Sequence, residues 1–132
     1  ALRPFVGQPG GRRSHSEGCM NRGDVVEVDW QYSDMSGSKK RPAVVVQADF
    51  LNGVIDDTIL VQITGTRHGI PGTEVELDPA VETHSGLSKV CVASCSNIMT
   101  FEQLRVLRTI GFLSTAAMQQ IEDCLKKVMA IP

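Results

Sequence analysis

Hydrophobic and polar residues alternate along much of this chain in short runs that are typical of β-strands. Val26 and Val28 lie two positions apart in DVVEVDW, and Val75 and Leu77 do the same in TEVEL. Such alternation predicts strands with one buried face. The continuous apolar run in RPAVVVQ predicts a strand that is buried on both faces. The strands predicted in this way are Asp24–Trp30, Pro42–Gln47, Thr58–Ile63, Thr73–Leu77, Ser88–Ala93 and Asn97–Met99.

The last part of the chain changes to the period of an α-helix. Its apolar residues at three- and four-residue spacing are Met118, Ile121, Leu125 and Val128. They predict an amphipathic helix of about four turns, with Ser114 as its N-cap. Thr100 and Gln103 have the form of a capping box and predict a short helical turn before it. Five to seven short strands followed by a helix predict a mainly β fold, a small bent sheet or barrel covered by that helix.

Polar segments with glycine and proline separate these elements. Gln31–Lys40 predicts a mobile loop, and Gly65–Gly72 predicts a second one. Residues 1–19 hold four of the twelve glycines and two of the six prolines and show no periodicity, which predicts a disordered leader. We therefore expect a single domain over residues 20–132, with Met20 at or close to the natural start.

Composition narrows the class of protein. The 132 residues are 42% hydrophobic and 21% charged with a net charge of −2, so a broadly basic nucleic-acid-binding surface is excluded and any such contact must be local. The apolar runs are far too short to cross a membrane. Four cysteines without a CxxC spacing indicate a reducing, cytoplasmic protein. Cys91 and Cys95 with His68 or His84 form an alternative zinc site, which the cysteine spacing disfavours.

The common hydrolase, metalloprotease and nucleotide-binding motifs are absent from the sequence. Two polar residues, however, stand at the ends of strands that are predicted to be neighbours. Arg41 precedes the strand Pro42–Gln47, and Thr64 follows the strand Thr58–Ile63. If these strands pair antiparallel, the start of the first lies beside the end of the second. Arg41 and Thr64 would then share one sheet edge, where a guanidinium and a hydroxyl suit a phosphate.

Other charged residues lie near this pair in the sequence. Lys39 and Lys40 precede Arg41, and Arg67 and His68 follow Thr64, so all four can extend an anion-binding site. A plainer interpretation stays open, because basic runs are usually solvated loops and strands often end in threonine.

Several segments together resemble the MazF/PemK family of toxin endoribonucleases. Residues 22–29 read RGDVVEVD and residues 41–47 read RPAVVVQ, and these two segments are the most specific. Looser matches are IT at 63–64, GLS at 86–88 and IGxLS at 110–114. The resemblance spans roughly residues 21–129, which is nearly everything after the leader.

The resemblance implies a small SH3-like β-barrel of the CcdB/PemK type with a C-terminal α-helix. It also implies a cytoplasmic homodimer that binds RNA across its interface, needs no cofactor or metal, has no membrane association and is neutralised by a cognate antitoxin. The catalytic arginine and threonine of the family fall on Arg41 and Thr64. The residues expected to contact RNA are Lys39, Lys40, Gly65, Thr66, Arg67 and His68.

The reaction implied by the resemblance is attack of a ribose 2′-OH on the adjacent phosphate of single-stranded RNA. Its products are a 2′,3′-cyclic phosphate and a 5′-OH, and the cleavage is sequence-specific. Arg41 is expected to stabilise the phosphoryl charge and Thr64 to donate a hydrogen bond. A guanidinium holds its proton too firmly to act readily as a base, so the proton acceptor stays open, with His68 as one candidate.

The sequence departs from the family at positions that many members use. An acidic residue followed by Gln is replaced by Ser94 and Cys95, and a common Arg is replaced by Asn97. The loop before Arg41 is short and lacks a Gly-x-Glu segment. An alternative function is therefore a weak or inactive member that acts as a binding protein, either a gyrase-poison-like protein or an RNA- or antitoxin-binding module.

Overall fold

The computed structural model describes residues 19–31 and 34–132. Its elements, in chain order, are β1 (Asp24–Gln31), β2 (Ser38–Val45), α1 (Asp49–Asn52), β3 (Asp57–Thr64), β4 (Glu74–Leu77), β5 (Cys91–Glu102), a 3₁₀ turn (Gln103–Arg105), β6 (Arg108–Phe112) and α2 (Thr115–Val128). The predicted leader lies outside the described residues apart from Cys19, which is buried. Within these ranges, no helix is both long enough and apolar enough to span a membrane.

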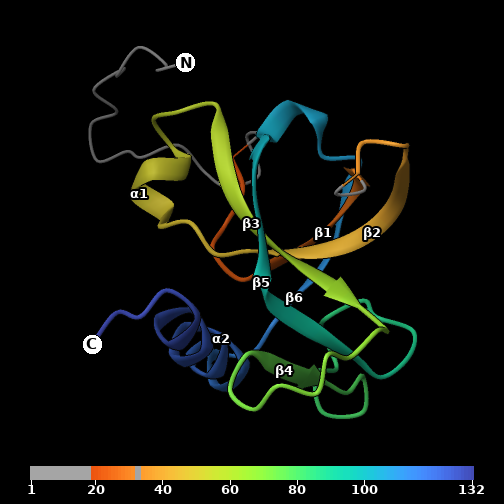
Figure 1. The fold of residues 1–132 in the computed structure, drawn as a ribbon. Helices are drawn as coiled ribbons and strands as arrows, with labels where there is room; N and C mark the ends of the chain where they lie inside the picture. The colour runs from red at the N-terminus through yellow and green to blue at the C-terminus, as the bar shows by residue number, and fades with distance from the viewer. Residues whose placement is uncertain (1–18, 32–33) are drawn as a thin grey trace.

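The six strands of the described residues form one antiparallel sheet in the order β4-β5-β3-β2-β1-β6. The sheet curls strongly, and α2 lies against it near β4 (Figure 1). Together the curl and α2 confirm the predicted fold, a small bent sheet of the barrel type with a C-terminal helix.

Two hydrophobic clusters lie on opposite faces of the strands, because successive side chains of a strand point to opposite sides. The helix-side cluster packs under α2 and includes Val25, Val44, Val61, Ile63, Val75, Leu77, Cys91, Ala93, Cys95, Leu113, Ala117, Met118, Ile121 and Cys124. The far-side cluster consists of Val26, Val28, Trp30, Ala43, Val45, Leu60 and Phe101. Strands β1, β2 and β3 are therefore buried on both faces where they contribute to both clusters. The apolar run in RPAVVVQ predicted this for β2, whereas β1 was expected to bury one face only.

The start of α2 is fixed by a buried carboxylate. The hydroxyl of Ser114 accepts a hydrogen bond from the Ala117 amide at 3.1 Å, which confirms Ser114 as the N-cap. The amide and hydroxyl of Ser114 donate to the two carboxylate oxygens of Glu82 at 2.7 and 2.8 Å. A negative charge at a helix N-terminus is favourable, so Glu82 both docks the helix and complements its dipole.

Two glycines allow the segment around residue 85 to pack directly on β6. A Cβ on Gly86 would lie 2.1 Å from the carbonyl oxygen of Ile110, and one on Gly111 would lie 2.2 Å from the carbonyl oxygen of His84. Gly86 also has a φ of +73°, which other residues rarely adopt. The backbone contact is completed by the Phe112 amide, which donates to the His84 carbonyl at 2.8 Å. The GLS and IGxLS segments are thus two sides of one contact.

A buried cluster of polar side chains joins α1, β3 and the end of β5. The Oδ1 of Asn52 accepts from Gln47 Nε2 at 2.8 Å and from the Thr58 hydroxyl at 2.7 Å. Gln103 donates from Nε2 to the Asn52 carbonyl at 2.9 Å, and its Oε1 accepts from the Met20 amide at 2.8 Å. Buried polar groups need such partners, so this Asn52 cluster fixes the position of α1.

The second strand begins earlier than predicted. β2 starts at Ser38 rather than Pro42, so Lys39 and Lys40 lie in the ladder instead of in a mobile loop, and Arg41 lies within the strand instead of just before it. Lys40 faces Asp29 and Lys39 faces Trp30 across the β1–β2 pair. The pattern of hydrophobic residues missed this part of the strand because its side chains are exposed, although its backbone is paired.

The region after residue 88 also differs from the prediction. One strand, β5, replaces the two predicted strands Ser88–Ala93 and Asn97–Met99, and Thr100 pairs with Ile59 in the ladder instead of capping a helix. The short helical turn is present but begins at Gln103. α1 and β6 were not predicted, because α1 is a single turn and β6 is largely exposed.

Candidate active site

Arg41 and Thr64 meet at the paired ends of β2 and β3. In this antiparallel pair Ala43 faces Gln62, and two more residues along each strand bring Arg41 opposite Thr64. The Nη1 of Arg41 donates to the Thr64 hydroxyl at 3.5 Å, and the Thr66 amide donates to the same oxygen at 3.2 Å. Thr64 is 8% exposed, whereas Arg41 is half-buried. The predicted pair is thus in contact.

A groove of about 440 Å³ lies beside Arg41. Its lining residues are Trp30, Gln31, Asp34, Arg41, Gln62, Ser96, Asn97, Ile98 and Met99. Side chains two apart on a strand share a face, so Arg41 projects on the side of Ala43 and Val45, and Thr64 on the side of Gln62. The groove therefore lies on the same face of the sheet as the far-side cluster, and it extends to Arg41 near the start of β2.

One wall of this groove is an irregularity in β5. Gln62 pairs with Ser94 and the preceding residue Val61 pairs with Ile98, so one step on β3 corresponds to four on β5. Three residues of β5, 95–97, are thus extra to the ladder. Bulges of this kind turn side chains away from the regular alternation. Here the bulge supplies Ser96 and Asn97 to the groove.

Asn97 and Gln62 present amide groups along the groove. Asn97 Nδ2 donates to the hydroxyl of the fully buried Ser94 at 2.9 Å, which holds the side chain of Asn97 in place. Gln62 is half-buried, and its side chain makes no hydrogen bond to any residue in the described part of the chain. The sequence pattern missed these residues, although Gln62 had a signal: it stands two positions before Thr64 and so shares its face.

The other predicted site residues are placed differently. Lys39 and Lys40 are exposed on β2, and Gly65 and Thr66 are exposed directly after β3. Arg67 pairs with Glu76 at 3.0 Å. Arg67 is therefore committed to a carboxylate of β4 and does not line the groove.

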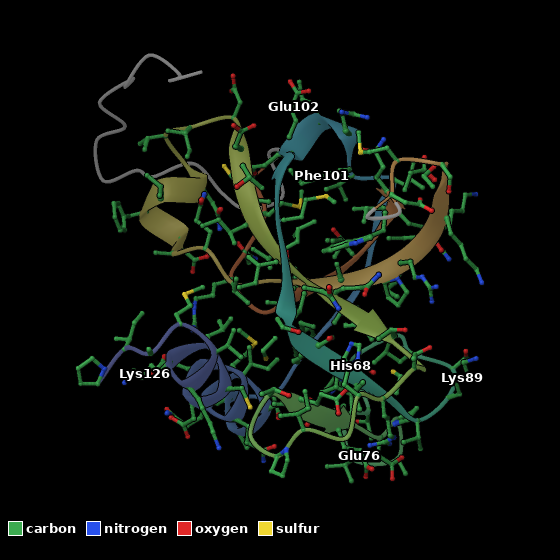
Figure 2. All side chains as sticks on the ribbon, in the orientation of Figure 1. His68, Glu76, Lys89, Phe101, Glu102 and Lys126 are labelled. Carbon is green, nitrogen blue, oxygen red and sulfur yellow. The ribbon has the colours of Figure 1, made fainter. Side chains whose placement is uncertain are left out.

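His68 lies in the loop after β3, on the side of β4, where Figure 2 also labels Glu76. Its amide donates to the Glu74 carboxylate at 2.6 Å, and the Gly69 amide donates to the same group at 3.2 Å. These hydrogen bonds, with that of His68 foremost, hold the pKa of Glu74 below its usual value. Glu74 and Glu76 of β4 thus hold the loop that contains Arg67 and His68, and neither of these two residues lines the groove.

Comparison with known proteins decides the family. A model described as "PemK-like, MazF-like toxin of type II toxin-antitoxin system" matches residues 21–129. The chain belongs to this family. Endoribonuclease MazF9 of Mycobacterium tuberculosis (strain ATCC 25618 / H37Rv) is 32% identical over 116 residues, which cover 81% of this chain and 93% of MazF9. The family expected from RGDVVEVD and RPAVVVQ is confirmed.

Solved structures of PemK-like and MazF-like toxins share the fold. An endoribonuclease in complex with its cognate antitoxin from a mycobacterial species has a TM-score of 0.70 at 24% identity, over 86% of this chain and 97% of that one. A chain of the MazE-MazF (Form-III) crystal structure from Deinococcus radiodurans has a TM-score of 0.67 at 18% identity, over 86% and 99% of the two chains. The curled sheet with its C-terminal helix is thus the fold of this toxin family.

The departures from the family pattern are clustered on the β5 bulge. Ser94 is fully buried and bonded to Asn97, and Cys95 is fully buried in the helix-side cluster. Burial, with a smaller effect of the neighbouring Cys124, raises the pKa of Cys95 to about 12. Neither Ser94 nor Cys95 supplies a carboxylate, so the acidic group expected from the resemblance has no counterpart at these positions.

The alternative zinc site has no counterpart in the described ranges. No three His, Cys, Asp or Glu side chains come together there in the way that metal ligands do. Cys91 and Cys95 instead belong to the helix-side cluster, and the ring of His84 stacks on that of Phe112, with ring centres 5.0 Å apart.

Proposed function

We propose that this chain is an endoribonuclease toxin that cleaves single-stranded RNA at short sequences, with Arg41 and Thr64 as its catalytic residues. The observation that carries the proposal is the contact between these two side chains beside a groove, in a member of the PemK-like and MazF-like toxin family. The name of the relative MazF9, an endoribonuclease, supports the same activity.

The hydrogen bonds of Thr64 define what its hydroxyl can do. A hydroxyl has two acceptor sites and one donor. Both acceptor sites are used, one by Arg41 and one by the Thr66 amide, so the proton of Thr64 is directed to another acceptor. A phosphate oxygen of the RNA is that acceptor in the proposed complex, and Arg41 lies close enough to share the phosphate.

The proposed reaction is attack of the ribose 2′-OH on the adjacent phosphate, with release of a 5′-OH and formation of a 2′,3′-cyclic phosphate. Negative charge develops on the phosphoryl oxygens in the transition state, and the guanidinium of Arg41 stabilises it without a metal ion. Arg41 can also donate a hydrogen bond from a guanidinium N–H to the leaving 5′-oxygen. Catalytic roles are proposed for Arg41 and Thr64 alone, and no side chain is assigned as the base.

The proposed partners are RNA, a cognate antitoxin and a second copy of the chain, all in the cytoplasm. Antitoxin binding is supported by the solved relatives, which include an endoribonuclease in complex with its cognate antitoxin and a MazE-MazF complex. Lys39, Lys40, Gly65 and Thr66 are exposed near Arg41 and Thr64, so they are proposed to contact the RNA backbone. Arg67 and His68 are proposed as weaker contacts, because β4 holds them.

The test is cleavage of a long RNA of mixed sequence by the purified chain. Cleavage is expected to continue in EDTA, to give 5′-OH ends and to stop when the scissile ribose lacks its 2′-OH. It is also expected to be lost in Arg41→Ala. Intact RNA after prolonged incubation with the wild-type chain would refute the enzyme, and inhibition by EDTA would refute the metal-independent mechanism.

One structural observation favours a second candidate, an inactive binding protein. Ser94 is uncharged and fully buried, and it stands where the resemblance implies an acidic residue in many members. This candidate predicts that the wild-type chain binds RNA or an antitoxin and leaves RNA uncut. Fluorescence anisotropy with labelled RNA, run beside the cleavage assay, separates it from the enzyme.

A further inference from the structure

We propose that Gln62 and Asn97 read one RNA base, that of a nucleotide adjoining the scissile phosphate. This inference rests on the proposed function, because it places the phosphate at Arg41 and Thr64. It goes further by assigning sequence specificity to two amides, of which sequence analysis named only Asn97, as a departure from the family pattern.

The first argument is position. Gln62 shares a strand and a face with Thr64, two residues away, which is roughly 7 Å along the strand. It also pairs with Ala43, two residues from Arg41. Gln62 is therefore one side chain farther into the groove than Arg41 and Thr64, which are proposed to hold the phosphate. The sugar and base of a nucleotide bound at that phosphate would extend toward Gln62.

The second argument is the chemistry of the groove walls. Gln62 and Asn97 each carry a hydrogen-bond donor and an acceptor, and amides of this kind pair with base edges. The amide of Gln62 has no protein partner among residues 19–31 and 34–132, so base contacts would satisfy it. Trp30, Ile98 and Met99 add apolar surface for the base.

The third argument is electrostatic. Asp34 lines the groove and lies beyond Gln31 and Ser38, the outermost paired residues of the β1–β2 hairpin, so it is farther out than Arg41. The Ser36 amide donates a hydrogen bond to Oδ1 of Asp34 at 3.0 Å, which holds this carboxylate in place. The positive charge of Arg41 thus lies inside the groove, and the carboxylate of Asp34 lies at its rim as a hydrogen-bond acceptor. This arrangement favours a nucleotide that binds with its phosphate inward and the N–H groups of its base outward.

The fourth argument is how Asn97 is held. The bulge frees it from the ladder, and its bond to Ser94 fixes its rotamer, so the amide is pre-organised without being needed for strand pairing. Pre-organised polar groups discriminate well, because a wrong base leaves them unpaired. Ser94 thus acts as a positioning residue for Asn97.

The experiment compares the cleavage sites of wild type, Asn97→Asp and Gln62→Met in a randomised RNA pool, by sequencing the 5′-OH ends. Asn97→Asp replaces a donor by an acceptor, and the Ser94 hydroxyl can donate to the new carboxylate. Gln62→Met keeps length and removes hydrogen bonding. Gln119→Ala on α2 is the matched control, because Gln119 is an exposed amide bonded to Asp123.

We expect the preference at one RNA position to change by about 5- to 100-fold in both variants, with cleavage retained and the control unchanged. An unchanged site preference in both would overturn the inference and leave the proposed function standing. Loss of all cleavage, with folding retained, would also overturn it, because these residues would then be catalytic.

A binding assay keeps the inference testable if the wild type cuts no RNA. The intact chain and its variants are titrated with labelled oligonucleotides of a single base type, at one salt concentration, because RNA affinity depends on salt. The ratio of affinities between base types is expected to change by the same factor in the variants. Equal ratios in all proteins would refute the base-reading role.

Discussion

Arg41 and Thr64 lie opposite each other because β2 and β3 keep a constant register from Val45 and Leu60 outward, and their side chains join at 3.5 Å. The two residues come from strands connected by α1, so the contact depends on the pairing of these strands and on that of β2 with β1, in whose ladder Arg41 lies. A change that removes one functional group and keeps the strands intact is therefore the cleanest test of the site.

Thr64→Val is expected to lower the rate of RNA cleavage by about 100-fold or more, because valine keeps the shape of threonine and removes the hydroxyl directed at the phosphate. Thr64→Ser keeps the hydroxyl and is the matched control, for which most activity is expected to remain. Rates are measured on one RNA under single-turnover conditions. Equal rates for the valine and serine variants would remove Thr64 from the mechanism.

The contact between Arg41 and Thr64 was predictable from sequence, since two apolar runs with a short connection form an antiparallel pair. The groove was not predictable in the same way. In β5 the polar residues of SCSN look like a break between two strands, but they are a bulge within one. Hydrophobic periodicity detects strands by buried side chains, so it missed β6 and the exposed start of β2, whose pairing depends on backbone groups.

Gly111→Ala is expected to lower the free energy of unfolding by about 2 kcal/mol or more, because the new Cβ would overlap backbone atoms of His84 and Ser85. Gly65→Ala is the control, since nothing lies within 4 Å of its Cβ position. Urea denaturation followed by circular dichroism measures both. Similar stability of the two variants would contradict the close contact between the residues around 85 and β6.

Because the thiol of Cys95 is buried, we expect the protein to lose stability at alkaline pH. Burial raises its pKa from 9.0 to about 12, so between these values the unfolded thiol loses its proton while the folded thiol keeps it. The unfolded state then binds fewer protons, and the free energy of unfolding falls as pH rises, by at most about 1.4 kcal/mol per pH unit for this group. Below pH 9 the thiol has no such effect.

The measurement is urea denaturation of wild type and Cys95→Ala at intervals from pH 8 to pH 11. The variant is expected to be less stable at every pH because it leaves a cavity, but to lose less stability as pH rises. The difference between the two slopes is the test, since every titrating group except Cys124, which interacts with Cys95, is expected to titrate equally in both proteins. Parallel curves would show that the Cys95 thiol is not shielded as the structure indicates.

Glu74→Ala is expected to accelerate hydrogen exchange of the His68 and Gly69 amides, because both donate to the Glu74 carboxylate. Glu76→Ala is the matched control: it removes the pair with Arg67 but no amide bond in the loop. Exchange is followed by NMR at neutral pH. Unchanged protection of His68 in Glu74→Ala would show that the loop is held by other contacts.

The same interaction has a pH dependence of known sign. The pKa of Glu74 is lowered chiefly by the His68 amide, so its contribution to stability is present above the ordinary value of 4.5 and is lost as pH falls below it. The protection of the two amides is therefore expected to decrease in acid, after correction for intrinsic exchange. No such decrease is expected in Glu74→Ala.

The Asn52 cluster also sets an order of events during protein synthesis. Met20 and Gln103 are 83 positions apart, and Gln103 and Asn52 are 51 apart. A ribosome releases the strands that carry Arg41 and Thr64 well before it releases Gln103. Until then the Asn52 carbonyl lacks the donor that Gln103 supplies, so the Asn52 cluster is incomplete in the nascent chain. A toxin built in this way completes its fold only after Gln103 has left the ribosome.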